Sequence, residues 1–191
     1  MEDFESLLYN PKFLYSNSQE FFKIGIFSAN DFFYKVSITP QGNKNIIKYV
    51  SVPAVNISFA LELALKGLHL QVFKTHPKGH SLLKLFSELP ENIIARIQKQ
   101  KAHKKYEHFN IVEISRSDNK HIPFNKGLCY INGSMGEVLS NLKLQDNSFC
   151  DFRYMFEMGT KGKPFYYNFL FMANITHNSL NTLYEIIKNK K

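Results

Sequence analysis

The sequence predicts an all-α protein arranged as an up-and-down helical bundle. Apolar residues recur at helical spacing in several segments, whereas the alternation typical of half-buried strands is nearly absent. The long segments 18–37 and 53–74 favour antiparallel packing, as in bundles of long helices. The chain has 191 residues, 44% of them hydrophobic, which suits one domain with a sizeable core. We therefore expect a single helical domain over residues 1–191.

The first two predicted helices are the longest. Residues 18–37 form one, with Ser18 as a candidate N-cap. Residues 53–74 form the other, which starts with a proline, a residue that the first turn of a helix tolerates. Because its middle is apolar on nearly every side, we expect it to be the buried central helix. Two helix breakers in residues 75–79 end it.

Shorter elements are predicted further along the chain. A helix is expected at residues 80–89, and another begins at Pro90 and continues to about Phe109. Residues 115–127 have the composition of a surface loop. Helical patterns then return at residues 128–142, 147–156 and 165–188. The start of the last segment, residues 165–171, stays open between helix and strand.

Composition excludes several classes of protein. The 18 Phe and 10 Tyr argue against disorder, and 9 Gly, 7 Pro and 2 Cys exclude a collagen, a low-complexity chain and a disulfide scaffold. No apolar run approaches the roughly 18 residues that cross a bilayer, and the acidic N-terminus differs from a secretory signal. Cys129 and Cys150 lack metal-ligand partners at standard spacing. We therefore predict a cytoplasmic protein with no membrane contact, no metal and no cofactor.

The formal net charge of +8 suggests an anionic partner such as nucleic acid. A solvated Lys-rich surface is the simpler explanation, since nearly all the basic residues are lysines. The densest basic stretch contains Lys101, Lys104 and Lys105, and we place it on an exposed helix where it can meet phosphates. It lacks aromatic residues before Tyr106, so no base-stacking surface is predicted there.

Two charged residues interrupt the most apolar helix. Glu62 and Lys66 are spaced i to i+4 with the acid first, the better orientation for an ion pair. A buried carboxylate has more acceptor sites than one ammonium fills, so we expect a second donor. Arg153 is the best candidate, because an arginine binds a carboxylate through two parallel hydrogen bonds. The three side chains form a buried brace that fixes helix register, or they line a cleft that contacts a ligand phosphate or base, or they do not meet.

Three blocks of sequence carry a family resemblance. They are FALELALKGL at residues 59–68, GHSLLKLF at residues 79–86 and FRYMFE at residues 152–157. Together they resemble the HEPN superfamily (higher eukaryote and prokaryote nucleotide-binding domains), over a core at about residues 18–157 with an additional C-terminal helix. The resemblance implies a helical bundle of two antiparallel helix pairs. Many similar proteins are metal-independent ribonucleases of toxin–antitoxin and phage-defence systems, and others bind RNA or nucleotides without catalysis.

The resemblance also implies partners and a binding surface. The expected partners are a second copy in a homodimer, RNA or a nucleotide, and a cognate antitoxin or nucleotidyltransferase. His80, which follows Gly79 at a predicted helix start, is expected to cap or pack and is kept as a binding candidate. The candidate binding residues are Glu62, Lys66, His80, Arg153, Tyr154, Lys101, Lys104 and Lys105.

Catalytic members of the superfamily carry an Arg followed, after four to six residues, by a His near the start of the last core helix. That helix would hold Arg153 here, but no His follows it at this spacing. Two other pairs match, Arg96 with His103 and Arg116 with His121. The first pair shares a face of its predicted helix, whereas the second lies in a polar loop. In such a pair the His moves a proton during attack of an RNA 2′-hydroxyl, and the Arg stabilises the phosphorane charge.

Three functions follow from these observations. The leading hypothesis is a HEPN-like, non-catalytic module that binds RNA or a nucleotide in a defence or toxin–antitoxin context. The second is a metal-independent ribonuclease that uses a displaced Arg/His pair. The third is a structural or protein-interaction module in which the charged cluster is a brace.

Overall fold

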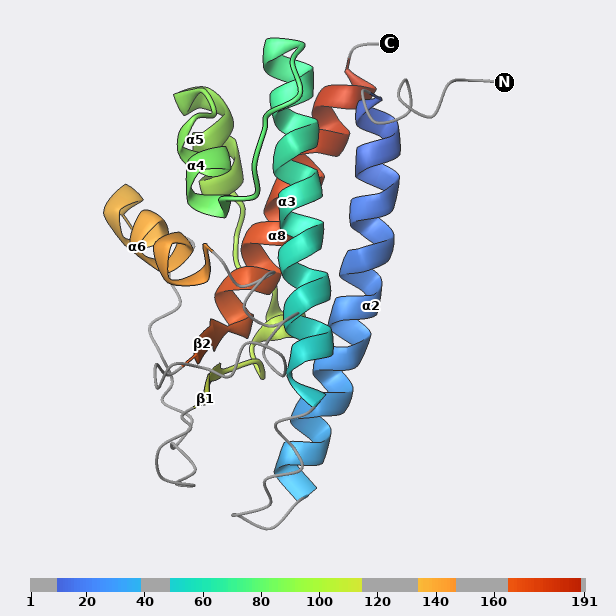
Figure 1. Ribbon diagram of the computed structural model, residues 1–191, viewed down its shortest axis with the longest axis vertical. Helices are drawn as coiled ribbons and strands as arrows, with labels where there is room; N and C mark the ends of the chain where they lie inside the picture. Colours follow the sequence, from blue (N-terminus) through green and yellow to red (C-terminus); the bar gives the residue numbers. More distant parts are fainter. Residues whose placement is uncertain (1–9, 39–48, 115–133, 147–164, 190–191) are drawn as a thin grey trace.

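Six α-helices and one small sheet form the regular structure of the described residues (Figure 1). The computed structural model describes residues 10–38, 49–114, 134–146 and 165–189. The elements, in chain order, are α2 (Pro11–Ile38), α3 (Ser51–Phe73), α4 (Leu82–Ser87), α5 (Glu91–Lys99), the 3₁₀ helix η2 (Lys104–Tyr106), β1 (Ile111–Ile114), α6 (Met135–Gln145), β2 (Phe165–Asn168) and α8 (Phe169–Lys188). The all-α fold class is confirmed.

Three long helices, α2, α3 and α8, pack side by side and form the core of the bundle (Figure 1). α3 is buried on nearly all sides, as its apolar pattern predicts. The completely buried apolar residues of α3 are Ala54, Ile57, Ala60, Leu61, Ala64, Leu65 and Leu68. α8 is the predicted additional C-terminal helix, and it packs into the hydrophobic core, since Phe169, Phe171 and Met172 are completely buried.

α3 is also long and apolar enough to cross a membrane by length and composition. However, 67% of its most apolar window is buried inside the fold, and it carries a buried ion pair. Helices of this kind are usual in the cores of soluble proteins. The burial of α3 therefore argues for a core helix.

The start of α2 corrects one prediction. The helix begins at Pro11, and Oδ1 of Asn10 accepts a hydrogen bond from the backbone N–H of Lys12 at 2.9 Å. Ser18 is therefore not an N-cap. It lies inside α2, completely buried, and its hydroxyl donates to the carbonyl oxygen of Ala60 in α3 at 2.7 Å. An earlier proline at the first helical position extends the helix beyond the segment with the clearest apolar period.

The helices predicted after α3 occur in the predicted order, but they begin and end at different residues. α3 ends where Lys74 adopts a left-handed conformation (φ 60°) and its N–H bonds the carbonyl of Leu70. α4 begins after Ser81, whose hydroxyl accepts from the backbone N–H of Lys84. α5 begins directly after Pro90 but ends at Lys99, so the prediction of one helix to about Phe109 is wrong. The next residues are extended and then form η2 and β1.

The strand alternative for the start of the last segment is confirmed. β1 and β2 pair antiparallel, with Ile111 opposite Asn168 and Ile114 opposite Phe165. α8 follows at once, because Oδ1 of Asn168 accepts from the backbone N–H of Phe171 at 3.0 Å and caps the helix.

The described part of the predicted 128–142 helix is α6, which begins with a capping box of Ser134 and Glu137 and continues to Gln145. The predicted loop at 115–127 and helix at 147–156 lie outside the described residues.

Candidate functional site

The charged residues of α3 form a buried cluster with a neighbouring histidine. Oε1 of Glu62 accepts hydrogen bonds from Nζ of Lys66 at 2.8 Å and from Nδ1 of His80 at 2.8 Å. The Glu62 side chain is only 2% exposed and that of Lys66 11%, whereas that of His80 is 66% exposed. The cluster therefore connects the middle of the central helix to the surface segment that precedes α4.

The second donor to Glu62 is His80 among the described residues. Arg153, which the sequence suggested for that role, lies outside them, as does Tyr154. The other carboxylate oxygen of Glu62, Oε2, is buried and has no hydrogen-bond partner within the described part of the chain. His80 does not cap α4, because Ser81 does. These contacts are those of a brace between α3 and α4.

The segment around His80 is fixed on both sides. Gly79 before it has φ 91°, a conformation that glycine adopts without strain. Asp146, at the end of α6, accepts from the hydroxyl of Ser81 and from the backbone N–H of Leu83, each at 2.8 Å. The start of α4 is thus bonded to both α3 and α6.

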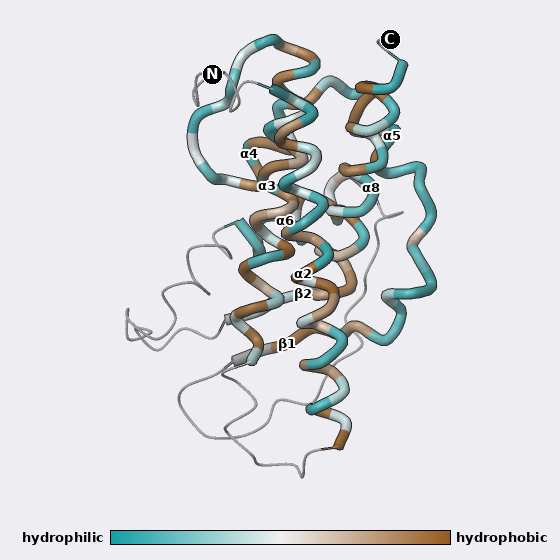
Figure 2. The backbone as a smooth tube through the Cα atoms, turned by 90° about the vertical axis from the view of Figure 1, so that its right-hand side faces the viewer, coloured by the Kyte–Doolittle hydropathy of each residue, from teal (hydrophilic) through white to brown (hydrophobic). Residues whose placement is uncertain are grey.

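A second cluster lies where residues 99–106, here called the basic segment, run along α8. Figure 2 shows the chain between α5 and β1 as a largely hydrophilic stretch at one edge of the molecule. Lys101, Lys104 and Lys105 are exposed. They lie on extended chain and in η2 rather than on a continuous helix, so the predicted helical placement is wrong, while the predicted exposure of the three lysines agrees with the structure.

Asparagine and glutamine side chains hold the basic segment against α8. Nδ2 of Asn178 donates to the carbonyl oxygens of Ile97 at 3.0 Å and Gln100 at 3.3 Å. Oδ1 of Asn174 accepts from the backbone N–H of His103 at 2.8 Å. Nε2 of Gln100 donates to the hydroxyl of Thr182 at 3.0 Å. Because Asn178 satisfies carbonyls at the end of α5, the helix can stop there without leaving them unpaired.

Two histidines meet under this segment. The ring centroids of His103 and His177 are 3.7 Å apart, and Nδ1 of His177 shares a 3.1 Å hydrogen bond with the hydroxyl of Tyr106. Nζ of Lys105 lies 4.8 Å from the centroid of the Tyr106 ring. Sequence reasoning missed His177, because it has no Arg at the expected spacing. The run of polar residues around it in an otherwise apolar helix is the signal that could have found it.

Both imidazoles are held in the neutral form. Burial, followed by the neighbouring His103 and Lys105, lowers the pKa of His177 to about 4. Burial, followed by the neighbouring Lys105, lowers the pKa of His103. Burial also lowers the pKa of Lys105. The positive charge of this surface at neutral pH therefore comes from its lysines.

The Arg/His pairs of the sequence do not form a site in the described residues. Nη2 of Arg96 pairs with Oε2 of Glu185 at 2.7 Å. Glu185 lies eight residues after His177 on α8, about 12 Å along the helix axis, so Arg96 is directed away from the histidine pair. Arg96 and His103 do not share a helical face, because α5 ends between them. Arg116 and His121 lie outside the described residues.

Within the described ranges, no group of three or more His, Cys, Asp or Glu side chains could hold a metal ion. Two polar clusters are therefore compared as candidate sites: the Glu62 cluster and the histidine pair beside the basic segment. Neither has the arrangement of an Arg and a His that phosphodiester cleavage in this superfamily is expected to use.

Comparison with known proteins matches the part of the chain that holds the Glu62 cluster and the basic segment. Residues 48–118 match the model of the HEPN domain. This segment contains α3, α4, α5 and the basic segment, and it includes two of the three blocks that carry the resemblance. No curated protein and no solved structure matches the chain. The match, over less than half of the chain, and the helical fold together support a HEPN-like protein.

Proposed function

We propose that this HEPN-like protein binds RNA through its phosphates, without cleaving it, and that the basic segment is the contact surface. The single observation that carries the proposal is the placement of Lys101, Lys104 and Lys105. All three are exposed on a short segment whose backbone is fixed by side chains of α8.

Fixed lysines favour phosphate binding for two reasons. Each ammonium that neutralises a phosphate releases counterions, which is the main source of affinity for nucleic acid. A segment already held in place also loses less conformational entropy on binding. Asn174 and Asn178 supply this order, since their side chains bond the backbone at His103 and Gln100. The side chain of Gln100 adds a hydrogen bond to the hydroxyl of Thr182 on α8.

Binding without cleavage is favoured over the ribonuclease alternative by the position of Arg96. Its guanidinium pairs with Glu185, about two helical turns from His177. Within the described residues, the histidine pair has no arginine beside it to stabilise charge on a phosphorane, and Lys105 is the cation near it. We extend the proposal to a cytoplasmic homodimer with an antitoxin or nucleotidyltransferase partner in a defence system, for which the support is the family resemblance.

The test compares two variants that remove the same number of charges. In one, Lys101, Lys104 and Lys105 are changed to Gln. In the control, the exposed lysines Lys78, Lys143 and Lys188 are changed to Gln. Binding of a fluorescein-labelled single-stranded RNA is measured by anisotropy at several salt concentrations.

We expect the slope of log affinity against log salt to be smaller in magnitude by about 2 in the first variant than in the wild type. Each of the three lysines lost contributes about 0.7 when it contacts a phosphate of a single strand. The control should keep the wild-type slope. If the salt dependence of binding has the same slope in the two variants, the basic segment is not the contact surface. RNA cut by the wild type without metal, beyond a buffer control, would favour the ribonuclease.

A further inference from the structure

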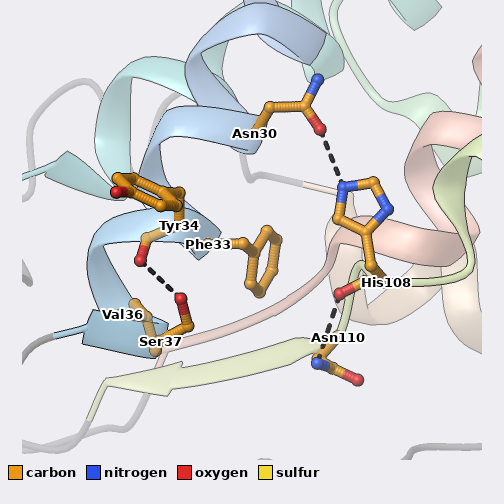
Figure 3. A pocket seen from close by; sticks show the side chains of 7 residues that line it. All are labelled: Asn30, Phe33, Tyr34, Val36, Ser37, His108 and Asn110. Carbon is orange, nitrogen blue, oxygen red and sulfur yellow. Dashed lines mark hydrogen bonds between the residues drawn. The ribbon is translucent and has the colours of Figure 1, made fainter.

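A second feature near the basic segment is an open pocket between the end of α2 and residues 108–110. Its volume is about 500 Å³, within the range of small-ligand sites. Phe33 and Tyr34 on α2 line it together with Asn30, His108 and Asn110 (Figure 3). Aromatic rings and amide groups thus face the same space.

The aromatic part of the pocket is flat and fixed. The ring of Phe33 stacks on that of Phe109 with centroids 5.3 Å apart and 21° between the planes, and it meets Phe169 edge-on at 5.3 Å. Tyr34 is 64% exposed and lies on one side of Phe33, with His108 on the other (Figure 3). Because Phe33 is only 9% exposed, Tyr34 is the ring against which a planar ligand can lie, and the buried rings hold the end of α2 in place.

The polar edge of the pocket keeps unused hydrogen-bonding groups. Nε2 of His108 donates to Oδ1 of Asn30 at 2.8 Å, and Nδ2 of Asn110 donates to the carbonyl of His108 at 3.4 Å. Within the described residues, Nδ2 of Asn30 and Oδ1 of Asn110 make no hydrogen bond, which leaves one donor and one acceptor. Nucleobase edges offer such groups in close proximity.

A continuous stack of rings connects this pocket to the lysines. Lys105 lies over Tyr106, Tyr106 stacks on Phe109 with centroids 5.8 Å apart, and Phe109 stacks on Phe33. Lys105 precedes His108 by three residues, so their Cα atoms are at most about 11 Å apart. A strand whose phosphate meets Lys105 therefore passes close to the pocket.

We propose that the pocket holds one unstacked base of a single-stranded RNA, stacked on the exposed ring of Tyr34 and bonded at its edge by Asn30 and Asn110. This inference rests on the proposed binding of RNA phosphates by the basic segment. Single strands are recognised in this way because an unpaired base exposes both its flat face and its hydrogen-bonding edge.

The test uses a single-stranded RNA that contains one 2-aminopurine, and it compares three variants of the protein with the wild type. Tyr34→Ala removes the exposed ring, and Tyr34→Phe keeps it. Tyr184→Ala removes a ring that is 48% exposed on α8, away from the pocket residues, and is the control. Circular dichroism checks that each variant is folded.

We expect Tyr34→Ala to weaken RNA binding about 5- to 100-fold, the effect of losing one stacked base, and to abolish the change in 2-aminopurine fluorescence. Tyr34→Phe and Tyr184→Ala should bind as the wild type does. An abasic strand of equal length tests the lysines alone, and adenosine, followed by ligand-observed NMR, tests the pocket alone.

The outcomes separate the two proposals. If RNA and the abasic strand bind equally well and Tyr34→Ala changes neither, the base pocket is overturned while phosphate binding stands. If neither strand binds but adenosine binds and Tyr34→Ala removes that binding, the pocket is supported and phosphate binding fails. If neither RNA nor adenosine binds, both are overturned.

Discussion

The two polar clusters of this protein handle buried charge in opposite ways. In the Glu62 cluster, a buried carboxylate has Lys66 and His80 as partners. In the histidine cluster, burial, followed by the neighbouring His103 and Lys105, lowers the pKa of His177 to about 4, so the ring stays neutral. The Glu62 cluster balances a buried carboxylate by pairing it. The histidine cluster avoids a buried charge, because its rings are deprotonated and keep only their hydrogen-bonding groups.

The difference follows from location. Glu62 lies in the middle of the central helix, where an unpaired ion would cost several kcal/mol, and a lysine one turn away is the nearest partner. His177 lies on α8 beneath a surface segment rich in lysines, where a proton would add to charge of the same sign. The first cluster therefore stabilises the fold only while all its members are present. The second depends on pH.

The largest expected effect comes from breaking the buried pair. Lys66→Met should lower the free energy of unfolding by about 3 kcal/mol, because the buried carboxyl group of Glu62 loses its ammonium partner. His80 still bonds Glu62, which places the loss at the lower end of the usual range. Urea denaturation at pH 7 measures it.

The double variant Glu62→Leu with Lys66→Met is the control for this prediction. Replacing both members of a buried ion pair by apolar side chains is often neutral, so we expect it to recover most of the loss. A loss below about 1 kcal/mol in Lys66→Met alone would show that the pair does not stabilise the core.

The features that were predicted correctly from the sequence depend on residues close to one another along the chain. The burial of α3 follows from apolar residues on every side, and the Glu62–Lys66 pair follows from spacing within one helix. The start of α5 after Pro90 follows from the chemistry of proline. In these cases the residues that decide the structure lie within about one turn of each other.

Long-range contacts decided the features that were missed. α5 ends at Lys99 because Asn178, far along the chain, bonds its last carbonyls. Ser18 is buried against Ala60, a contact that its cap-like sequence context does not reveal. His177 becomes part of a cluster only because His103 is brought to it from another segment. Such pairings are not visible in the periodicity of either segment.

The next prediction concerns the pH dependence of the histidine cluster. The pKa of His177 is about 4 in the folded protein and about 6.5 in an unfolded chain. Between these values the unfolded chain binds a proton that the folded one does not, so stability falls as pH decreases from about 6.5 to 4. Because the ring is partly exposed, we expect about 1 to 2 kcal/mol from this group.

His177→Gln isolates this contribution, since glutamine does not titrate and can still bond Tyr106. Urea denaturation of both proteins at pH 7 and pH 4.5 gives a difference in which the shared carboxylates cancel. The variant should lose less stability on acidification than the wild type. An equal loss in the two proteins would exclude His177 as the source.

The smallest expected effect concerns the exposed pair of Arg96 and Glu185. Its 2.7 Å separation is close to the 2.8 Å of the buried Glu62–Lys66 pair, but its side chains are 41% and 55% exposed rather than 2% and 11%. Water screens the exposed charges, so a double-mutant cycle with Arg96→Ala and Glu185→Ala should give a coupling below about 1 kcal/mol that decreases with salt. A coupling as large as that of the buried pair would mean that distance, rather than burial, sets the energy of ion pairs in this fold.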